Sequence, residues 1–311
     1  MSGGRGRCRP TNSSSGLPRQ PNHLNGRSPA VIGYGVCVGP TDLFDRICRP
    51  GIERVSAPDS KLFTVRGQKS MFAAYNALFD QAAADDNCTG LVLLHDDVEL
   101  SKNPVDVAGP VFEDDSVGVL GTLGGSNTIS LAWWNEKSDR RGRITDYNKA
   151  HDHGNGRYEV HAVDDVILCV SRWVIENIRF PAGRYVGFEG LGVILATTVR
   201  AAGKRVIVED LQDVMHHNAG RGFNGLGDWR RNELRWQREF FQLNAWERLG
   251  NQLEDLALPI LPARLGARRL GLRLAGRHNE VSDGESGDPA IDAIVDGWYR
   301  RCQGLRGRMV V

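Results

Sequence analysis

Short apolar runs alternate with helically spaced segments along this chain from residue 30 onward. The apolar runs have the length and composition of buried strands. Strands are predicted at residues 31–38, 52–55, 91–94, 117–120 and 205–208, and residues 158–163 and 166–170 form either two strands or one bent strand. Helices are predicted at residues 69–84, 190–202 and 226–249. Strands that alternate with helices predict an α/β layer fold with a mainly parallel sheet.

Both ends of the chain differ in composition from this alternating region. Residues 11–26 are rich in Ser, Asn, Pro and Gly, and the residues before Pro29 carry arginines but no acidic residue. Near the other end, two prolines and an Arg- and Leu-rich stretch precede a segment rich in Asp, Gly and Ser. We therefore predict a disordered basic arm over residues 1–29, an α/β domain over 30–249, and a helical, partly disordered extension over 250–311.

Composition narrows the class of protein. The chain has 311 residues, and its formal net charge is only +1, which argues against a general nucleic-acid binder. Its six cysteines include no Cys-x-x-Cys pair, so neither a zinc ribbon nor a dithiol redox motif is expected. The sequence shows neither a long apolar segment nor the apolar core of a signal peptide, so we expect a cytoplasmic protein.

Residues 256–277 form an unusual segment, in which apolar residues are interspersed with five arginines. Such a segment can lie along an anionic membrane surface, which would place the protein peripherally on the inner face of the membrane. The alternative is a helix packed on the α/β domain with its arginines in water. Pro259, Pro262 and three glycines weaken a helix here and favour this second interpretation.

Polar residues follow directly after the predicted strand at residues 91–94. His95, Asp96 and Asp97 come at its carboxyl end, where open α/β sheets place their ligands. Adjacent carboxylates repel each other unless a cation compensates, and oxygen ligands favour Mg²⁺ or Mn²⁺. The alternative is a solvated acidic turn.

The order of several motifs resembles the family-2-like group of GT-A glycosyltransferases. The segment LVLLHDDVEL, residues 91–100, is similar to the family's D-x-D region. SMFAAYNALFDQA precedes it, and VGVLGTLGGS, the pair Trp133 and Trp134, and VDDVILCVSRWVIENIRF follow it in the family's order. The resemblance covers residues 31–223 and implies a GT-A fold that binds a nucleoside diphosphate sugar and Mn²⁺ or Mg²⁺. It also implies that Asp97 binds the metal and that His95 and Asp96 lie at the diphosphate.

Four further residues are assigned from the resemblance. Asp59 and Asn76 match positions near the base and ribose, although a turn residue and a helix-surface amide are equally simple interpretations. The segment VMHHNAGRGF is similar to a C-terminal His segment that completes metal or diphosphate binding. We assign His217 to the metal, with weak preference over His216, and Arg221 to a phosphate.

The catalytic base is the least clear of the implied residues. The family carries acids at the start of the late helix, where this chain has Gly192 and Ile194. Glu189 is the remaining candidate, and its alternative role is to complement the helix dipole. Asp165 and Asp164 are reserve candidates, with a tight turn as their alternative.

The resemblance implies a hexosyltransferase-like enzyme that transfers a sugar, with inversion, to a glycan or lipid-linked acceptor of the cell surface. An inactive paralogue that only binds a nucleotide sugar is the first alternative, suggested by Gly192 and Ile194. A nucleotidyltransferase is the second, although the Gly-rich, basic loop that it needs after the first strand is not evident. No nucleic-acid partner is expected.

Overall fold

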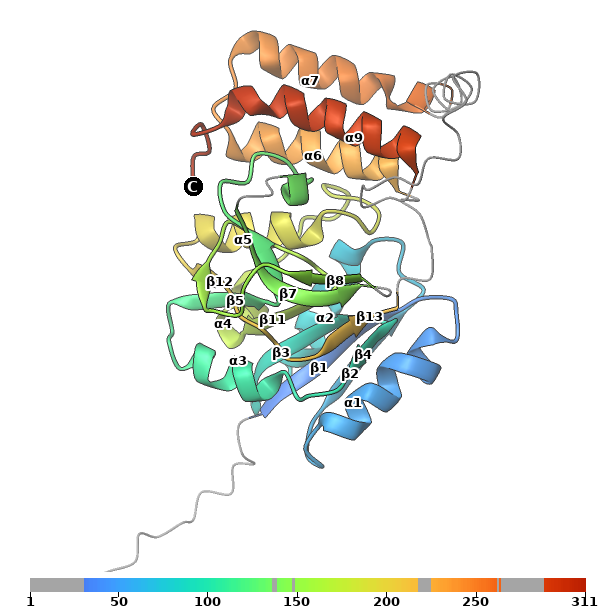
Figure 1. Ribbon diagram of the computed structural model, residues 1–311, viewed down its shortest axis with the longest axis vertical. Helices are drawn as coiled ribbons and strands as arrows, with labels where there is room; N and C mark the ends of the chain where they lie inside the picture. The colour runs from blue at the N-terminus through green and yellow to red at the C-terminus, as the bar shows by residue number, and fades with distance from the viewer. Residues whose placement is uncertain (1–30, 136–138, 147–148, 218–224, 262, 264–287) are drawn as a thin grey trace, which may run out of the picture.

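The computed structural model describes residues 31–135, 139–146, 149–217, 225–261, 263 and 288–311 (Figure 1). The strands are β1 Val31–Val38, β2 Leu62–Arg66, β3 Cys88–His95, β4 Val98–Leu100, β5 Val117–Gly121, β6 Leu123–Gly125, β7 Arg140–Asp146, β8 Lys149–Asp152, β9 Tyr158–Glu159, β10 Ala162–Val163, β11 Ile167–Ser171, β12 Arg205–Val208 and β13 Val214–His216. The α-helices are α1 Arg49–Val55, α2 Met71–Ala83, α3 Val105–Phe112, α4 Arg172–Asn177, α5 Leu191–Ala201, α6 Leu226–Phe240, α7 Ala245–Ala257 and α9 Pro289–Cys302. Short helical turns are η1 Phe44–Cys48, η2 Trp133–Asn135, η4 Leu258–Ile260 and η5 Gln303–Leu305.

The main sheet has seven strands in the order β2-β1-β3-β11-β5-β12-β9. Strands β2, β1 and β3 run parallel, as do β5 and β12, and β11 runs antiparallel to both of its neighbours. Five strands therefore share one direction, which confirms the predicted α/β fold with a mainly parallel sheet. The central strands are buried on both faces, which explains why they appear as continuous apolar runs in the sequence.

A second sheet crosses the carboxyl end of the first. Its order is β10-β6-β7-β13-β4, and β8 pairs with β7 at its side. Strand β4 follows β3 after only Asp96 and Asp97, so this two-residue turn joins the two sheets. In the second sheet, β13 lies between β4 and β7, with His216 in register with Val98 on one side and Asp146 on the other. The strand order thereby brings residues from three distant segments to one turn.

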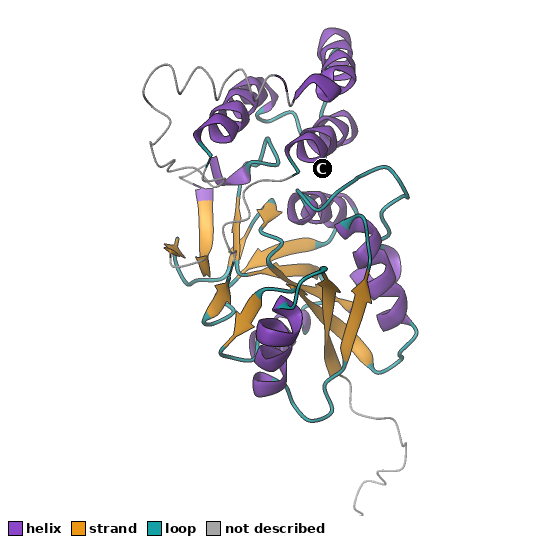
Figure 2. Cartoon of the chain, turned by 90° about the vertical axis from the view of Figure 1, so that its right-hand side faces the viewer, coloured by secondary structure: helices purple, strands orange, loops and turns teal. Residues whose placement is uncertain are grey.

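Helices cover the main sheet, and a helical layer lies at one end of the molecule. Helix α2 packs on β1, β2 and β3, whereas α5 packs on β10 and β12. Helices α6, α7 and α9 lie together above the sheets in Figure 1, and Figure 2 shows the same layer from the side. The rings of Trp229 in α6 and Trp298 in α9 stack with their centroids 5.6 Å apart. The last helix is therefore part of the fold, packed on α6.

Two elements differ from the sequence prediction. Residues 52–55 belong to helix α1, not to a strand, and Pro50 lies in the first turn of that helix, a position that proline favours. The second strand is β2, further along the chain. The long helix predicted over residues 226–249 is two helices, because Phe241 is extended and Asn244 forms a capping box with Glu247 that starts α7. Helix α7 runs through residue 249, and the domain limits at 29 and 249 stay predictions.

Residues 158–163, predicted as one strand, form β9 at the edge of the main sheet and β10 in the second sheet. The remaining predicted strands and helices are confirmed within a few residues, and Gly203 ends α5 with a φ of 81°. Among the described residues, no helix combines the length and apolar character that crossing a bilayer requires. The basic arm and most of the segment 256–277 lie outside the described residues, so peripheral membrane contact stays a prediction.

We expect Gly192→Ala to lower the free energy of unfolding by about 1–3 kcal/mol, as measured by urea denaturation. A Cβ at this position would lie 2.2 Å from the Val163 carbonyl oxygen, a backbone atom of β10 that cannot move aside easily. Gly250→Ala is the matched control, because a Cβ at this position within helix α7 meets no atom within 4 Å beyond its chain neighbours and its own helix backbone. We expect the control to change stability by at most about 1 kcal/mol, in the stabilising direction. Equal effects in both variants would show that helix propensity, not the contact with β10, decides the outcome.

Candidate active site

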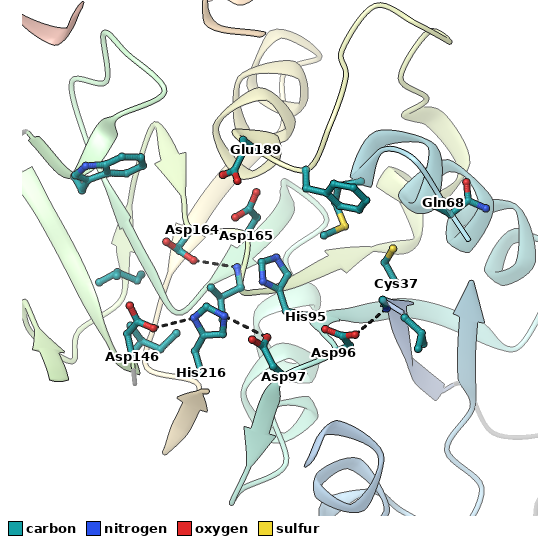
Figure 3. Close-up of a pocket in the computed structure, with 18 of the residues that line it drawn as sticks. Cys37, Gln68, His95, Asp96, Asp97, Asp146, Asp164, Asp165, Glu189 and His216 are labelled. Atoms are coloured by element: carbon teal, nitrogen blue, oxygen red, sulfur yellow. Dashed lines mark hydrogen bonds and ion pairs between the residues drawn. The ribbon is translucent and has the colours of Figure 1, made fainter. Parts of the chain in front are cut away.

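A cavity of about 850 Å³ opens where the two sheets meet (Figure 3). Its lining comes from the ends of β1, β2, β3 and β7, from the turn before β11, and from the start of α5. The aromatic side chains of Trp133, Trp134 and Phe188 also line it. Ligands of open α/β sheets bind at the carboxyl ends of the strands, so the cavity lies where the fold predicts a binding site.

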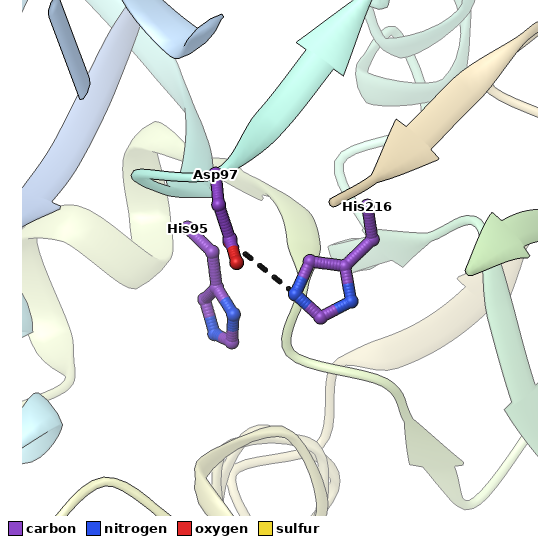
Figure 4. Close-up of side chains that lie close together, drawn as sticks. All are labelled: His95, Asp97 and His216. Carbon is purple, nitrogen blue, oxygen red and sulfur yellow. Dashed lines mark ion pairs between the residues drawn. The ribbon is translucent and has the colours of Figure 1, made fainter. Parts of the chain in front are cut away.

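Three side chains form a compact cluster on one side of this cavity. His95, Asp97 and His216 each offer one ligand atom, and these atoms lie within 4.8 Å of one another (Figure 4). The Nε2 atom of His216 lies 3.3 Å from Asp97 Oδ1. The backbone N–H of His217 donates to the Asp97 carbonyl over 3.0 Å, which fixes the end of β13 against the turn. The backbone therefore holds His216 beside Asp97.

His216 lies between two carboxylates. Its Nδ1 atom is 2.9 Å from Asp146 Oδ1, and its Nε2 atom faces Asp97. Burial alone would lower the pKa of His216, but the hydrogen bonds and charges of both carboxylates outweigh it and raise the pKa to about 10. Burial likewise opposes ionisation of Asp97, yet His216 keeps the pKa of this carboxyl below its usual value. The cluster is thus a strongly coupled set of charges, with Asp146 orienting the imidazole from behind.

The cluster has the chemistry of a site for a divalent cation. A carboxylate oxygen and two imidazole nitrogens can hold a divalent transition-metal ion, Mn²⁺ among them. The Nε2 atom of His95 is buried and has no hydrogen-bond partner among the described residues. Burial also lowers the pKa of His95, which favours the neutral imidazole that ligates metals. These observations fit the metal that the resemblance implies.

Asp96 points away from the cluster, toward the end of β1. Its Oδ2 atom accepts a hydrogen bond from the Gly39 backbone N–H over 2.8 Å. A side chain at residue 39 would collide with this carboxylate, since a Cβ would lie 2.9 Å from the same oxygen. Asp96 therefore ties β1 to the turn after β3, and both lie in the lining of the cavity.

Three more carboxyl groups line the cavity on the side of α5. Asp164, Asp165 and Glu189 lie together in Figure 3. Asp164 accepts a hydrogen bond from the Val166 N–H over 3.0 Å, and Asp165 accepts one from the Gly192 N–H over 3.3 Å. Burial, followed by the charge of Asp165, raises the pKa of both Asp164 and Glu189 to about 7. A carboxyl group with such a pKa is suited to accept a proton near neutral pH.

Two predicted nucleotide-binding residues do not reach the cavity. Asp59 is exposed, in the turn before β2, because the second strand begins ten residues later than predicted. The Asn76 side chain donates to the Phe180 carbonyl over 2.8 Å and accepts from the Phe180 N–H over 3.0 Å. Asn76 therefore holds the segment after α4 against α2, a structural contact that a sequence motif alone does not distinguish from ligand binding.

The structure places His217, the predicted metal ligand, outside the cluster. Its Nε2 atom lies 2.8 Å from Glu99 Oε2, outside the cluster, whereas His216 takes the predicted place. Neighbouring side chains on a strand point to opposite faces, so only one histidine of the pair can face Asp97. His95, predicted at the diphosphate, joins the cluster instead. Arg221 lies outside the described residues.

Sequence reasoning missed several residues that line the cavity, among them Arg66, Gln68 and Asp146. Arg66 ends β2 and Gln68 follows it, at the place where Asp59 was expected, and Asp146 ends β7. Residues 62–66 have the pattern of a strand, and this pattern could have located Arg66 and Gln68. The sequence prediction placed the second strand at residues 52–55 instead. Asp146 carries no local signal, because its partner His216 is brought to it only by the pairing of β7 with β13.

The residues at 192 and 194 are explained by packing. Gly192 lies so close to the β10 backbone that no side chain fits, and Ile194 is fully buried in the core. An acidic side chain would have no room at residue 192, and at residue 194 it would be buried away from solvent. Glu189, before the helix, is the acid of this segment that lines the cavity.

Comparison with known proteins gives the relatives of this chain. The model of the glycosyltransferase-like family matches residues 36–229. The streptomycin biosynthesis protein StrF of Streptomyces griseus is 72% identical over 281 residues, which cover 90% of this chain and 100% of StrF.

Two solved structures are also similar. The mannosyltransferase PcManGT from Pyrobaculum calidifontis, in complex with GDP-Man and Mn²⁺, has a TM-score of 0.43 at 14% identity and covers 90% of this chain and 85% of its own. GalNAc-T7 with UDP, GalNAc and Mn²⁺ has a TM-score of 0.42 at 9% identity, over 60% and 44% of the two chains. The assignment rests on the family model, which matches more than half of the chain. This chain belongs to the glycosyltransferase-like family.

Proposed function

We propose that this chain is a metal-dependent GT-A-type enzyme that transfers a sugar from a nucleoside diphosphate sugar to an acceptor hydroxyl, with inversion at the anomeric carbon. One observation supports this most directly. A single cavity is lined on one side by the cluster of His95, Asp97 and His216 and on the other by the half-buried carboxyl of Glu189. The cluster suits the binding of a diphosphate with its cation, and the Glu189 carboxyl suits the role of a general base.

The donor would occupy the side of the cavity formed by the ends of β1 and β2. Gly39 and Pro40 present backbone there, and Arg66 and Gln68 present side chains that can contact phosphate or base. When bound by Asp97, His95 and His216, Mn²⁺ or Mg²⁺ would supply positive charge against the charge that develops on the leaving diphosphate. Asp146 orients the His216 imidazole through its Nδ1 atom.

Glu189 is the residue that we assign to the acceptor proton. Its carboxyl lines the cavity, and its pKa of about 7 lets it hold a proton once it has taken one. A single displacement needs this base and no covalent nucleophile, since the acceptor oxygen attacks as the diphosphate leaves. Asp165 is the second candidate, although its Oδ2 atom already accepts from the Gly192 N–H.

The class of acceptor is proposed from the name of the relative StrF. StrF is named for streptomycin biosynthesis, and the identity of 72% extends over its whole length. This supports an acceptor from a biosynthesis of that kind over the cell-surface glycan or lipid-linked acceptor that the sequence suggested.

The metal site is tested by thermal stability. We expect Mn²⁺ together with GDP or UDP to raise the melting temperature of the unaltered protein, because a ligand of the native state stabilises it by mass action. Asp97→Ala should lose the part of this shift that depends on Mn²⁺. His217→Ala is the matched control and should keep it, since His217 pairs with Glu99 and lies outside the cluster.

Two other outcomes are informative. A Mn²⁺-dependent shift that persists in Asp97→Ala would contradict the metal site. A normal shift without any hydrolysis or transfer of the donor sugar would instead favour the alternative of a donor-binding protein without turnover.

A further inference from the structure

The proposed base, Glu189, lies in the irregular connection between α4 and α5. Gly187 and Gly190 of this connection have φ values of 68° and 80°, in the left-handed region that favours glycine. The Glu189 carboxyl faces Asp165 in Figure 3, and no hydrogen bond from another described residue reaches it. The place of this carboxyl in the cavity therefore depends on how the backbone of the connection is held.

One face of α6 runs along this connection. The polar residues of that face lie three or four positions apart in the helix, namely Asp228, Asn232, Arg235 and Glu239. Arg235 donates to the Gly183 carbonyl over 3.0 Å, and the Tyr185 hydroxyl donates to Glu239 over 2.6 Å. A polar stripe on a helix is ordinarily expected in water. Here it binds the segment that leads to the base.

Asn232 binds the part of the connection nearest to Glu189. Its side chain is fully buried, and it uses both amide hydrogens and its oxygen. The Oδ1 atom accepts from the Val186 N–H over 2.9 Å, and the Nδ2 atom donates to the carbonyls of Val186 and Glu189 over 2.8 and 3.0 Å. A buried amide needs such partners, and here all three belong to residues 186–189.

Helix α6 also confines the side chain of the base. Gly225, directly before α6, lies so close that a Cβ there would be 2.9 Å from Glu189 Cγ. Helix α6 is held in turn by α7 and α9, through the ion pair of Arg230 with Glu254 and the stacking of Trp229 on Trp298. The helical layer is therefore connected to the backbone of the cavity lining through α6.

We propose that Asn232 is a positioning residue, which holds the Glu189 carboxyl in the cavity by binding the backbone of residues 186–189 from α6. The proposal rests on the proposed function, because Glu189 is the base of that reaction. Asn232 itself belongs neither to the cavity lining nor to the cluster of His95, Asp97 and His216. It acts only through the segment that it binds.

The position of the Glu189 carboxyl can be measured without donor or acceptor. Burial, followed by the charges of Asp165 and Asp228, raises the pKa of Glu189 to about 7. An exposed glutamate has a pKa of about 4.3, so a carboxyl released from this place should titrate lower. The protein is labelled with ¹³C at its glutamate carboxyl carbons and titrated by NMR without added metal. The Glu189 signal is identified by its absence from Glu189→Gln.

Asn232→Ala removes all three hydrogen bonds, and we expect the pKa of Glu189 to fall by about 1–2 units in this variant. Gln237→Ala is the matched control, because Gln237 is a buried amide of the same helix. Its side chain contacts Cys302 and Asn251 in the helical layer instead of the connection. Both variants should lose stability, but the pKa of Glu189 should change only in Asn232→Ala.

Asn232→Leu is the second variant, used if Asn232→Ala does not fold. Leucine fills the place of the amide without its hydrogen bonds, so the same fall in the pKa of Glu189 is expected. Folding of each variant is checked by stabilisation with Mn²⁺ and GDP or UDP, which should persist because Asn232 lies outside the metal cluster.

Several outcomes would overturn the positioning role of Asn232. These are an unchanged pKa of Glu189 in a folded Asn232 variant, an equal fall in Gln237→Ala, or no glutamate that titrates near 7 in the unaltered protein. Failure of both Asn232 variants to fold while Gln237→Ala folds would assign Asn232 to folding instead. The glycosyltransferase proposal fails separately, if Mn²⁺ with GDP or UDP does not stabilise the unaltered protein.

Discussion

Glu189→Gln is expected to lower turnover by about 10² to 10⁴ fold, while nucleoside diphosphate and Mn²⁺ still stabilise the protein. Glutamine keeps the size of the side chain and its hydrogen-bonding capacity, but it cannot accept the proton of the acceptor hydroxyl. Steady-state transfer assays measure the loss. Glu113→Gln, an exposed glutamate at the end of α3, is the matched control and should transfer at the normal rate.

The pH profile gives an independent check of the same residue. Burial raises the pKa of Glu189 to about 7, and a base acts in its deprotonated form. The ratio kcat/KM of the unaltered enzyme should therefore rise as the pH increases through about 7 and fall below that value. If activity survives in Glu189→Gln and disappears in Asp165→Asn, the base is Asp165 instead.

Arg230→Met is expected to lower the free energy of unfolding by about 3–5 kcal/mol, measured by urea denaturation. Arg230 in α6 is 3% exposed and lies 2.7 Å from Glu233, whose side chain is fully buried, and 2.8 Å from Glu254 in α7. Burial opposes its charge, but these two carboxylates outweigh it and keep the pKa of Arg230 above its usual value. Removing the guanidinium leaves the Glu233 carboxylate buried without a cation.

The neighbouring residue is the control for this prediction. Arg231 is one third exposed and pairs with Asp228 at 3.2 Å, so Arg231→Met should cost at most about 1 kcal/mol. Adding Glu233→Gln to Arg230→Met removes the stranded charge and should recover part of the lost stability. Equal effects of the two arginine variants would contradict a buried ionic link between α6 and α7.

The buried ion pair also connects the helical layer to the α/β domain. Ser130, in the loop before η2, donates to the carboxylate of Glu233, and the Arg230 guanidinium lies 4.8 Å from the Trp298 ring centre. No local pattern in the sequence indicates these contacts, since Ser130 and Trp298 both lie far along the chain from Arg230 and Glu233. A charged residue on a helix is ordinarily expected in water, and the packing of α7 and α9 against α6 surrounds Arg230 instead.

The sequence by itself determined the α/β class, most of the central strands, and the location of the site at the end of β3. Those features depend on local properties: apolar runs mark buried strands, and polar residues that interrupt them mark the edge where a ligand can bind. Asp96 and Asp97 were named for the same reason, as acids at the end of a strand, whereas Glu189 was named from the family resemblance; all three line the cavity.

Only the tertiary structure decided which residues meet there. The choice of His216 over His217 depends on which face of β13 turns toward Asp97, and a shift of one residue in strand register would exchange the two. Asp146 reaches His216 through a parallel pairing between strands 70 residues apart. Asp59 and Asn76 lie outside the cavity lining for the complementary reason, because their side chains have suitable chemistry but the fold places one in solvent and the other in a backbone contact. Composition and spacing specify what a side chain can bind, whereas strand pairing and packing decide what it reaches.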